Sequence, residues 1–456
     1  MNDLARIEHV VVLMLENRSF DHALGSLALE GRPVDGVDAK LARFNTDLDG
    51  RKHVVAKLEP PRVSSFVPGP PHEWPYVREQ VDRMGGFVRA YQRSAGHADD
   101  LQPGDVMNYL TRDQLPMTYF LADHFTICER WFAAVPADTI PNRLYSLAGD
   151  AGHVKTTAPR VSWLDIPALD SIFEKMASPD DWLVFTGSIP LIFAVSPWRV
   201  FVANSGRWHT LSKFRSTVAE HQLPKLTWIE PTYFWEDKAC GAARHVWVDP
   251  VFRDTNDDHP PSHIEHGQAL IRYVYESLAR VPDVWAKTLL IVTYDEHGGF
   301  YDHVEPPAIA AGEVGLDGFT HRGVRVPTIL ISPFAEAQGV ARQQFDHCST
   351  LKFLCSWLGI RPWTNRIASP HVASVADALH DEPRGDAPMP AFDNPIAPPP
   401  IHSRRRHHHG NVPPLVVDLH KVTYREYPDA YERVFPHARA PLSTRMRWWF
   451  RHARRR

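Results

Sequence analysis

Two short apolar runs in this sequence end in the same kind of polar pair. Glu16 and Asn17 follow the run VVVLML, and Asp295 and Glu296 follow the run LLIVTY. Hard divalent cations take carboxylate and amide oxygens as ligands, and a phosphate oxygen can complete their coordination. Each pair alone is also typical of a cap on the helix or loop that follows. The repetition of the pattern favours a divalent metal site that binds a phosphate ester.

A threonine at the predicted start of a helix is the candidate nucleophile. The segment ADTIPNR around Thr139 has the composition of a loop that enters a helix, with Pro141 in the first turn. Free N–H groups and the positive end of the helix dipole attract phosphate at such a place and favour the alkoxide of a nearby hydroxyl. Thr139 is therefore predicted to attack phosphorus. Helix statistics alone favour an ordinary N-cap threonine instead, and sequence spacing does not separate the two interpretations.

Histidine is the side chain best suited to protonate a leaving group near neutral pH. His259 lies in the segment DDHPP, where acidic neighbours can orient its ring, and His72, His303 and His347 are further candidates. The chain has 26 histidines, so most of them must be structural or on the surface. The loop setting of His259 singles it out from the others.

The elements that must position these residues form an α/β pattern. The predicted strands are short apolar runs at 10–15, 182–185, 289–294 and 326–332. The predicted helices are periodic segments, notably 264–281 and 350–358. Apolar strands that alternate with helices predict a parallel sheet covered by helices on both faces. In such a sheet, ligands bind at the carboxyl ends of the strands, where both polar pairs lie.

Composition divides the chain at about residue 380. Residues 1–380 form the predicted catalytic domain, with an insertion of loops and short elements at about 30–105 that can cover the site. Residues 381–456 are a connector rich in Pro and His, followed by a basic tail that ends in RMRWWFRHARRR. Such a connector buries little apolar surface and is expected to be extended.

Charge and hydropathy limit the partners. The 456 residues carry a net charge of -4 with histidine neutral, which argues against a nucleic-acid partner. The basic, tryptophan-containing tail is suited to peripheral contact with an anionic membrane. The sequence has no apolar run of bilayer-spanning length and no recognisable signal peptide, so a cytoplasmic location is expected, with export by another route left open.

Several motifs occur in an order that resembles a known family. In chain order they are ENRSFDHALG, DTIPNR, DDHPP and DEHGGFYDHVEPP, followed by RVPTILISP and FDHCSTLKFL. Over about residues 5–360 the chain resembles the bacterial phospholipase C and acid phosphatase family of phosphoesterases. The resemblance implies an alkaline-phosphatase-like three-layer α/β/α sandwich with a mostly parallel central sheet.

The same resemblance implies roles for individual residues. The implied ligands of a divalent metal ion of unknown identity are Glu16, Asn17, Thr139, Asp295 and Glu296. Thr139 would form a covalent phospho-threonine that water then hydrolyses. His259 and His72 would contact the phosphate, and one of them would protonate the leaving oxygen.

Three functions follow from these patterns. The leading prediction is a phospholipase C-type phosphodiesterase that acts on a phosphate ester, with phospholipid as a candidate substrate. The second is an acid phosphatase, because the same metal and nucleophile would serve a monoester. The third is a non-catalytic protein that binds anionic membranes through its basic tail.

Overall fold

The computed structural model describes most of the chain up to residue 393. The described residues are 6–59, 66, 68–96, 101–157, 169–188, 190–191, 204–233, 255–385 and 387–393. The predicted basic tail, the end of the connector and Cys240 lie outside these ranges. The division at residue 380 stays a prediction. Contacts with the main body continue past it, since the Tyr275 hydroxyl donates to the Pro388 carbonyl oxygen at 2.5 Å.

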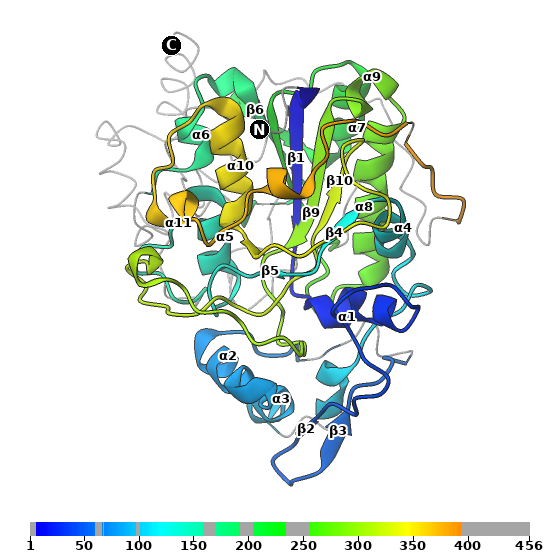
Figure 1. Ribbon diagram of the computed structural model, residues 1–456, viewed down its shortest axis with the longest axis vertical. Coiled ribbons are helices and arrows are strands. Elements are labelled where there is room, and N and C mark those ends of the chain that lie inside the picture. Colours follow the sequence, from blue (N-terminus) through cyan, green and yellow to red (C-terminus); the bar gives the residue numbers. More distant parts are fainter. Residues whose placement is uncertain are drawn as a thin grey trace, which may run out of the picture.

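An eight-stranded sheet forms the centre of the molecule (Figure 1), in the order β11-β4-β10-β9-β1-β8-β6-β7. Its strands are β1 (His9–Leu15), β4 (Thr126–Cys128), β6 (Trp182–Thr186), β7 (Trp208–Thr210), β8 (Leu226–Glu230), β9 (Thr288–Tyr294), β10 (Ile329–Ile331) and β11 (Val340–Ala341). The run from β9 through β1, β8 and β6 to β7 is parallel. β1 is buried almost throughout because strands flank it on both sides and helices cover both faces of the sheet. The predicted mostly parallel α/β sheet is confirmed.

The predicted parallel direction of one strand is wrong. The apolar segment 326–332 contains β10, but β10 pairs antiparallel with both β9 and β4. A parallel return needs a crossover to the opposite edge of the sheet. The segment between β9 and β10 instead stays at the carboxyl edge, where the carbonyl of Glu296 and the side chain of Asp302 contact the loop after β1. The chain therefore re-enters the sheet from that edge and runs backwards.

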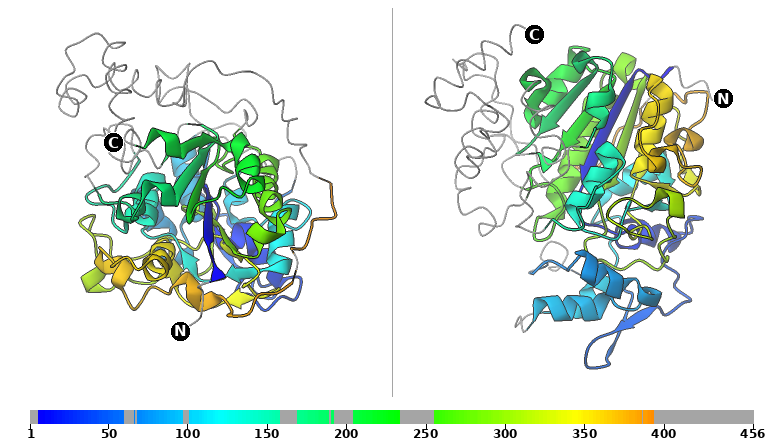
Figure 2. Two further views of the ribbon diagram at one scale, coloured as in Figure 1. Left: turned by 90° about the horizontal axis from the view of Figure 1, so that it is seen from above. Right: turned by 90° about the vertical axis from the view of Figure 1, so that its left-hand side faces the viewer.

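Helices cover both faces of the sheet, as Figures 1 and 2 show. On one face lie α4 (Pro116–His124), α7 (Phe214–Ala219) and α8 (Ile264–Ala279), and on the other lie α5 (Thr139–Ala148) and α10 (Cys348–Leu358). In α8, Leu270, Val274 and Leu278 are spaced four residues apart, so they form one buried stripe. The predicted helices at 264–281 and 350–358 correspond to α8 and α10, and the three-layer arrangement is confirmed.

The remaining elements are short. They are α1 (Phe20–Leu24), α2 (Trp74–Gln80), α3 (Phe87–Ala95), α6 (Ile172–Lys175), α9 (Pro282–Trp285), α11 (Asn365–Ala368), β2 (Phe44–Thr46), β3 (Lys52–Val54), β5 (Trp131–Phe132) and β12 (Phe345–Asp346). The insertion at 30–105 supplies α2, α3 and the β2–β3 hairpin, which lie beyond the carboxyl ends of the strands (Figure 1). None of the helices in the described ranges has an apolar stretch long enough to cross a bilayer.

A buried ion-pair cluster connects β12 to its surroundings. Asp346 accepts hydrogen bonds from Arg322 Nε at 2.9 Å and Arg366 Nε at 2.9 Å, and all three side chains are buried. Burial by itself would raise the pKa of Asp346, but the two guanidinium groups outweigh it and lower the pKa to about 2.

We expect Asp346→Asn to destabilise the fold less in acid than at neutral pH. Because the folded-state pKa lies below the ordinary value of 3.8, the carboxylate stabilises the fold above pH 3.8. This contribution, about 2 kcal/mol, is lost as the pH falls towards 2. Urea unfolding should show the gap between wild type and variant narrowing by about 1 kcal/mol from pH 7 to pH 3. The exposed Asp283→Asn should show no such narrowing, and a constant gap for Asp346→Asn would contradict the prediction.

Candidate active site

The ends of β1 and β9 bring the two predicted polar pairs together. The strands are parallel neighbours with Leu15 opposite Tyr294, so the residues after each strand lie side by side. The Asp295 N–H donates to the Leu15 carbonyl at 3.1 Å, and the Asn17 N–H donates to Asp295 Oδ1 at 3.4 Å. The structure therefore assembles one buried oxygen cluster, defined as Glu16, Asn17, Asp295 and Glu296.

The backbone of this cluster is tightly packed. Asn17 has φ 61°, a left-handed conformation that asparagine adopts more readily than most residues. Gly298 has φ 63°, and a Cβ on it would lie 2.6 Å from the Asn17 carbonyl oxygen. Glycine after the acidic pair therefore lets the two ligand loops approach each other.

The oxygen cluster fits a metal ion. Within the described part of the chain, Asn17 Oδ1 and Glu296 Oε1 are buried without a hydrogen-bond partner. An unpaired buried acceptor costs about 1–3 kcal/mol, and a hard cation would satisfy both oxygens. Burial and the neighbouring Asp295 also raise the pKa of Glu16 well above its ordinary value, and burial raises that of Asp295 to about 7. Both pKa values are expected to rise where buried carboxylates lie close together without enough positive charge to balance them.

Arg143 is a buried cation to which the sequence analysis assigned no role. Its Nε lies 3.1 Å from Asp295 Oδ2, its Nη2 lies 3.4 Å from Glu16 Oε1, and its Nη1 lies 3.2 Å from Glu230 Oε1. Two sequence signals could have found this group. Arg143 is four residues after Thr139 and so shares its helix face, and Glu230 ends the apolar run LTWIE just as the other acids follow theirs.

The start of α5 shows whether Thr139 is an ordinary N-cap residue. Asp138 occupies the N-cap position and Thr139 is the first helical residue, so the N-cap alternative for Thr139 is wrong. Asp138 Oδ2 accepts the Thr157 N–H at 2.8 Å, and Thr157 Oγ1 accepts the Ile140 N–H at 2.9 Å. Within the described residues the Thr139 hydroxyl makes no hydrogen bond. Its role as nucleophile and metal ligand stays a prediction.

His72 reaches the oxygen cluster from the loop before α2. Its Nδ1–H donates to the Pro70 carbonyl at 2.9 Å, which turns Nε2 towards Asn17 Nδ2 at 3.4 Å and Glu296 Oε1 at 3.9 Å. Burial would lower the pKa of His72, but Glu296 and Glu73 outweigh it and raise the pKa to about 9. The ring is therefore placed beside the predicted ligands.

His259 lies next to His72, with ring centroids 5.7 Å apart and ring planes at 79°. Its Nδ1 lies 2.6 Å from the Pro260 carbonyl, so a peptide oxygen orients the ring. The neighbouring Asp257 accepts the backbone N–H of His259 at 3.1 Å. Burial, aided by the charge of His72, lowers the pKa of His259 to about 4. The structure thus brings both predicted histidines together at one edge of the site.

The other two candidate histidines have different surroundings. His347 Nε2–H donates to the carbonyl oxygen of Asp295 at 2.6 Å, while Trp131 Nε1–H donates to His347 Nδ1 at 3.4 Å. His347 therefore supports the backbone of a predicted ligand. His303 Nδ1 contacts Asp21 Oδ2 at 2.7 Å and His303 Nε2 contacts Asp35 Oδ1 at 2.9 Å, so both ring nitrogens are engaged by carboxylates.

A second acidic group connects the segment after β1 to the segment after β9. Asp21, Asp302 and His303 present ligand atoms within 4.8 Å of one another. Arg325 already donates to Asp302 Oδ1 at 2.9 Å and to Asp21 Oδ1 at 3.1 Å. A guanidinium therefore supplies the positive charge here, and the group links the two loops as an ion-pair network.

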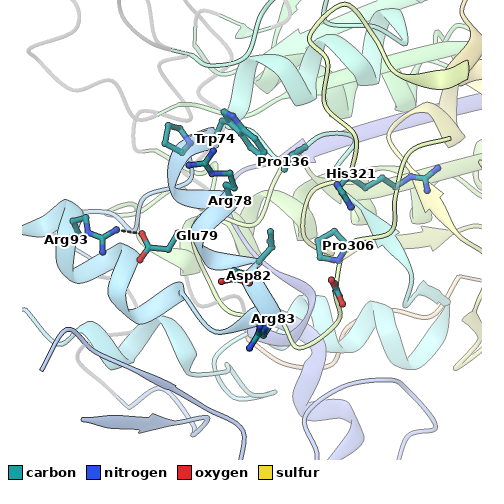
Figure 3. Close-up of a pocket in the computed structure, with 13 residues that line it drawn as sticks. Trp74, Arg78, Glu79, Asp82, Arg83, Arg93, Pro136, Pro306 and His321 are labelled. Carbon is teal, nitrogen blue, oxygen red and sulfur yellow. Dashed lines mark hydrogen bonds and ion pairs between the residues drawn. The ribbon is translucent and has the colours of Figure 1, made fainter. Parts of the chain in front are cut away.

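A cavity of about 710 Å³ lies between α2 and the segments that contain Pro136, Pro306 and His321 (Figure 3). Its lining includes Trp74, two residues after His72, and Pro136, three residues before Thr139. α2 supplies Arg78 and other charged groups to its wall. The cavity is therefore connected along the chain to His72 and Thr139, and neither of these residues lines it.

A buried oxygen cluster that fits a metal, at the carboxyl edge of a mostly parallel α/β sheet, defines the class as phosphoester hydrolases. The family model described as Phosphoesterase family matches residues 7–361. The chain belongs to this family.

Known relatives carry phospholipase names. Non-specific phospholipase C6 of Arabidopsis thaliana is 32% identical, and the match covers 84% of this chain and 74% of that one. Phospholipase C A of Mycobacterium tuberculosis is 29% identical over 78% of this chain and 74% of the relative. Among solved structures, a Vibrio parahaemolyticus protein in the alkaline phosphatase superfamily overlaps with a TM-score of 0.33 at 8% identity, covering 58% of this chain and 64% of that one.

Proposed function

We propose that this protein is a phospholipase C-type phosphodiesterase with Thr139 as its nucleophile. The observation that carries the proposal is the oxygen cluster, in which two buried acceptors receive no hydrogen bond. Thr139 begins α5, the helix whose Arg143 contacts this cluster. Relatives named as phospholipases C at about 30% identity over most of the chain support a diester substrate. The polar cavity lined by Trp74 and Pro136 is the candidate location for the second substituent of such a substrate.

Each residue of the site has a role in the proposed reaction. Glu16, Asn17, Asp295 and Glu296, with the Thr139 hydroxyl, would hold the divalent ion, which polarises the phosphate when bound. The Thr139 oxygen bonds to phosphorus, its proton passes to solvent, and the bond to the departing alcohol breaks. His72 or His259 gives the alcohol oxygen a proton. Water then hydrolyses the phospho-threonine and restores the hydroxyl.

Diester and monoester activity can be separated directly. We expect purified protein to hydrolyse p-nitrophenyl phosphorylcholine faster than p-nitrophenyl phosphate, and a chelator to abolish both rates because the oxygen cluster needs its cation. Adding back single divalent ions to the chelated protein would identify the metal. A preference for the monoester would favour an acid phosphatase, and full activity in chelator would contradict the metal site.

The leaving-group acid can be found with two substitutions. A good leaving group such as p-nitrophenolate departs without a proton, whereas an alkoxide needs one, and general acid catalysis contributes about 10²–10⁴-fold. We expect His72→Gln, whose ring faces the oxygen cluster, to lower hydrolysis of a short-chain phospholipid by about 10²-fold and that of p-nitrophenyl phosphorylcholine much less. His259→Gln is the matched comparison. The same pattern in His259→Gln alone would reverse the assignment.

A further inference from the structure

Large exposed hydrophobic side chains gather in one short segment. Within the described residues, four of the seven that are strongly exposed fall between residues 41 and 54: Leu41 at 53%, Phe44 at 43%, Leu48 at 51% and Val54 at 50%. Single exposed hydrophobics are ordinary, but a contiguous group marks an interaction surface.

Two of these residues, Phe44 and Val54, lie on the outer face of the β2–β3 hairpin, while Leu48 lies in its turn and Leu41 lies shortly before β2. Phe44 lies directly opposite Val54 in the antiparallel pair, and Asn45, which points the other way, lies opposite His53. Asn45 holds the inner face to the body, since its Nδ2 donates to the Met84 carbonyl at 3.0 Å and its Oδ1 accepts the Phe87 N–H at 2.9 Å. An antiparallel ribbon normally turns polar side chains outward, and this one turns Phe44 and Val54 outward.

Cations accompany the apolar side chains. Lys40, Arg51 and Lys52 are exposed, and Lys52 Nζ lies 4.2 Å from the centroid of the Phe44 ring. The nearby Asp47 is buried and is used locally, because it accepts the Arg51 N–H at 2.8 Å. Asp38 and Asp49 are also exposed, so the three exposed cations exceed the exposed acids by one. The hairpin therefore combines an apolar face with a weakly positive rim, a composition that suits the headgroup region of anionic bilayers.

The position of the hairpin matches that of the candidate active site. In Figure 1 and in the right-hand view of Figure 2 it projects from the end of the molecule beyond α2 and α3. That end holds the carboxyl ends of β1 and β9, which carry the oxygen cluster. A surface that docks through the hairpin would face the same side as the site.

We propose that the exposed apolar residues of the β2–β3 hairpin and its flank, Leu41, Phe44, Leu48 and Val54, dock on an anionic lipid bilayer. The apolar side chains enter the headgroup boundary, and the adjacent cations meet lipid phosphates. The inference rests on the proposed function, since docking would bring the site to a lipid phosphodiester. A second copy of the chain is a poorer occupant, because a symmetric contact would place Lys52 of each copy near that of the other.

Vesicle sedimentation tests the proposal with the full-length chain. Thr139→Ala serves as the background so that the lipids stay intact, and the vesicles contain phosphatidylcholine with about one third phosphatidylglycerol. Leu41→Ser/Leu48→Ser is expected to lower the partition coefficient at least about tenfold, because two apolar side chains no longer enter the interface. The matched control, Leu316→Ser/Met389→Ser, removes two exposed apolar side chains elsewhere and should change partitioning less than about twofold.

The basic tail is constant in all these proteins, so its contribution cancels in the comparison. Wild-type partitioning in the hairpin variant, or equal losses in the hairpin and control variants, would overturn the proposal. A wild-type dimer in sedimentation velocity that the hairpin variant dissociates would instead assign the face to a second copy. Hydrolysis of soluble p-nitrophenyl phosphorylcholine by proteins that keep Thr139 separates the two proposals. A failed diester assay with intact hairpin-dependent binding rejects only the proposed function, and the reverse rejects only the docking surface.

Discussion

Thr139→Ala is expected to lower kcat for p-nitrophenyl phosphorylcholine by at least about 10⁴-fold, because it removes the atom that bonds to phosphorus. The folded structure should tolerate the change, since Thr157 accepts the Ile140 N–H at the start of α5 and the Thr139 hydroxyl makes no hydrogen bond within the described residues. Thermal unfolding of the chelated proteins should therefore differ little. Acid-quenched wild-type enzyme should contain Thr139 that carries the phosphorylcholine group, which peptide mass spectrometry would detect.

Two further variants test whether the loss of activity is due to the hydroxyl of Thr139. Thr139→Ser keeps a hydroxyl at the start of α5 and should retain measurable activity. Thr210→Ala changes a threonine on β7, the last strand of the sheet, and should leave kcat unchanged. Activity in Thr139→Ala within tenfold of wild type would reject the threonine as nucleophile and point to direct attack by water.

Arg143→Met is expected to lower the free energy of unfolding by about 3–5 kcal/mol. The substitution keeps an apolar stem of similar length but leaves the buried carboxylates of Asp295, Glu16 and Glu230 without their shared cation. Urea unfolding in the presence of a chelator measures the full loss. A divalent ion bound to the oxygen cluster should restore part of it by supplying positive charge.

The matched control is Arg280→Met. Arg280 is exposed and pairs with Glu276 one helical turn away, so its loss should cost less than about 1 kcal/mol. If Arg143→Met lowers the free energy of unfolding no more than Arg280→Met does, the buried carboxylates must be protonated in the folded protein. Arg143 would then not be needed to neutralise them.

The sequence alone determined the parts of this protein that depend on local pattern. Apolar runs buried on both faces predicted β1, β6 and β9, and the polar pairs after two of them predicted the oxygen cluster. The prediction worked because a parallel sheet places successive strand ends on one edge, so adjacency in space follows from position along each strand. The i, i+4 relation of Thr139 and Arg143 was equally local.

Contacts between distant segments of the chain could not be predicted from the local patterns. The antiparallel direction of β10, the support of Asp295 by His347, the approach of His72 and the convergence of Glu230 on Arg143 join segments far apart in sequence. Their short motifs fit several arrangements equally well. Which one forms depends on the path of the connecting loops and on the pairing of every buried charge, and both are properties of the whole fold.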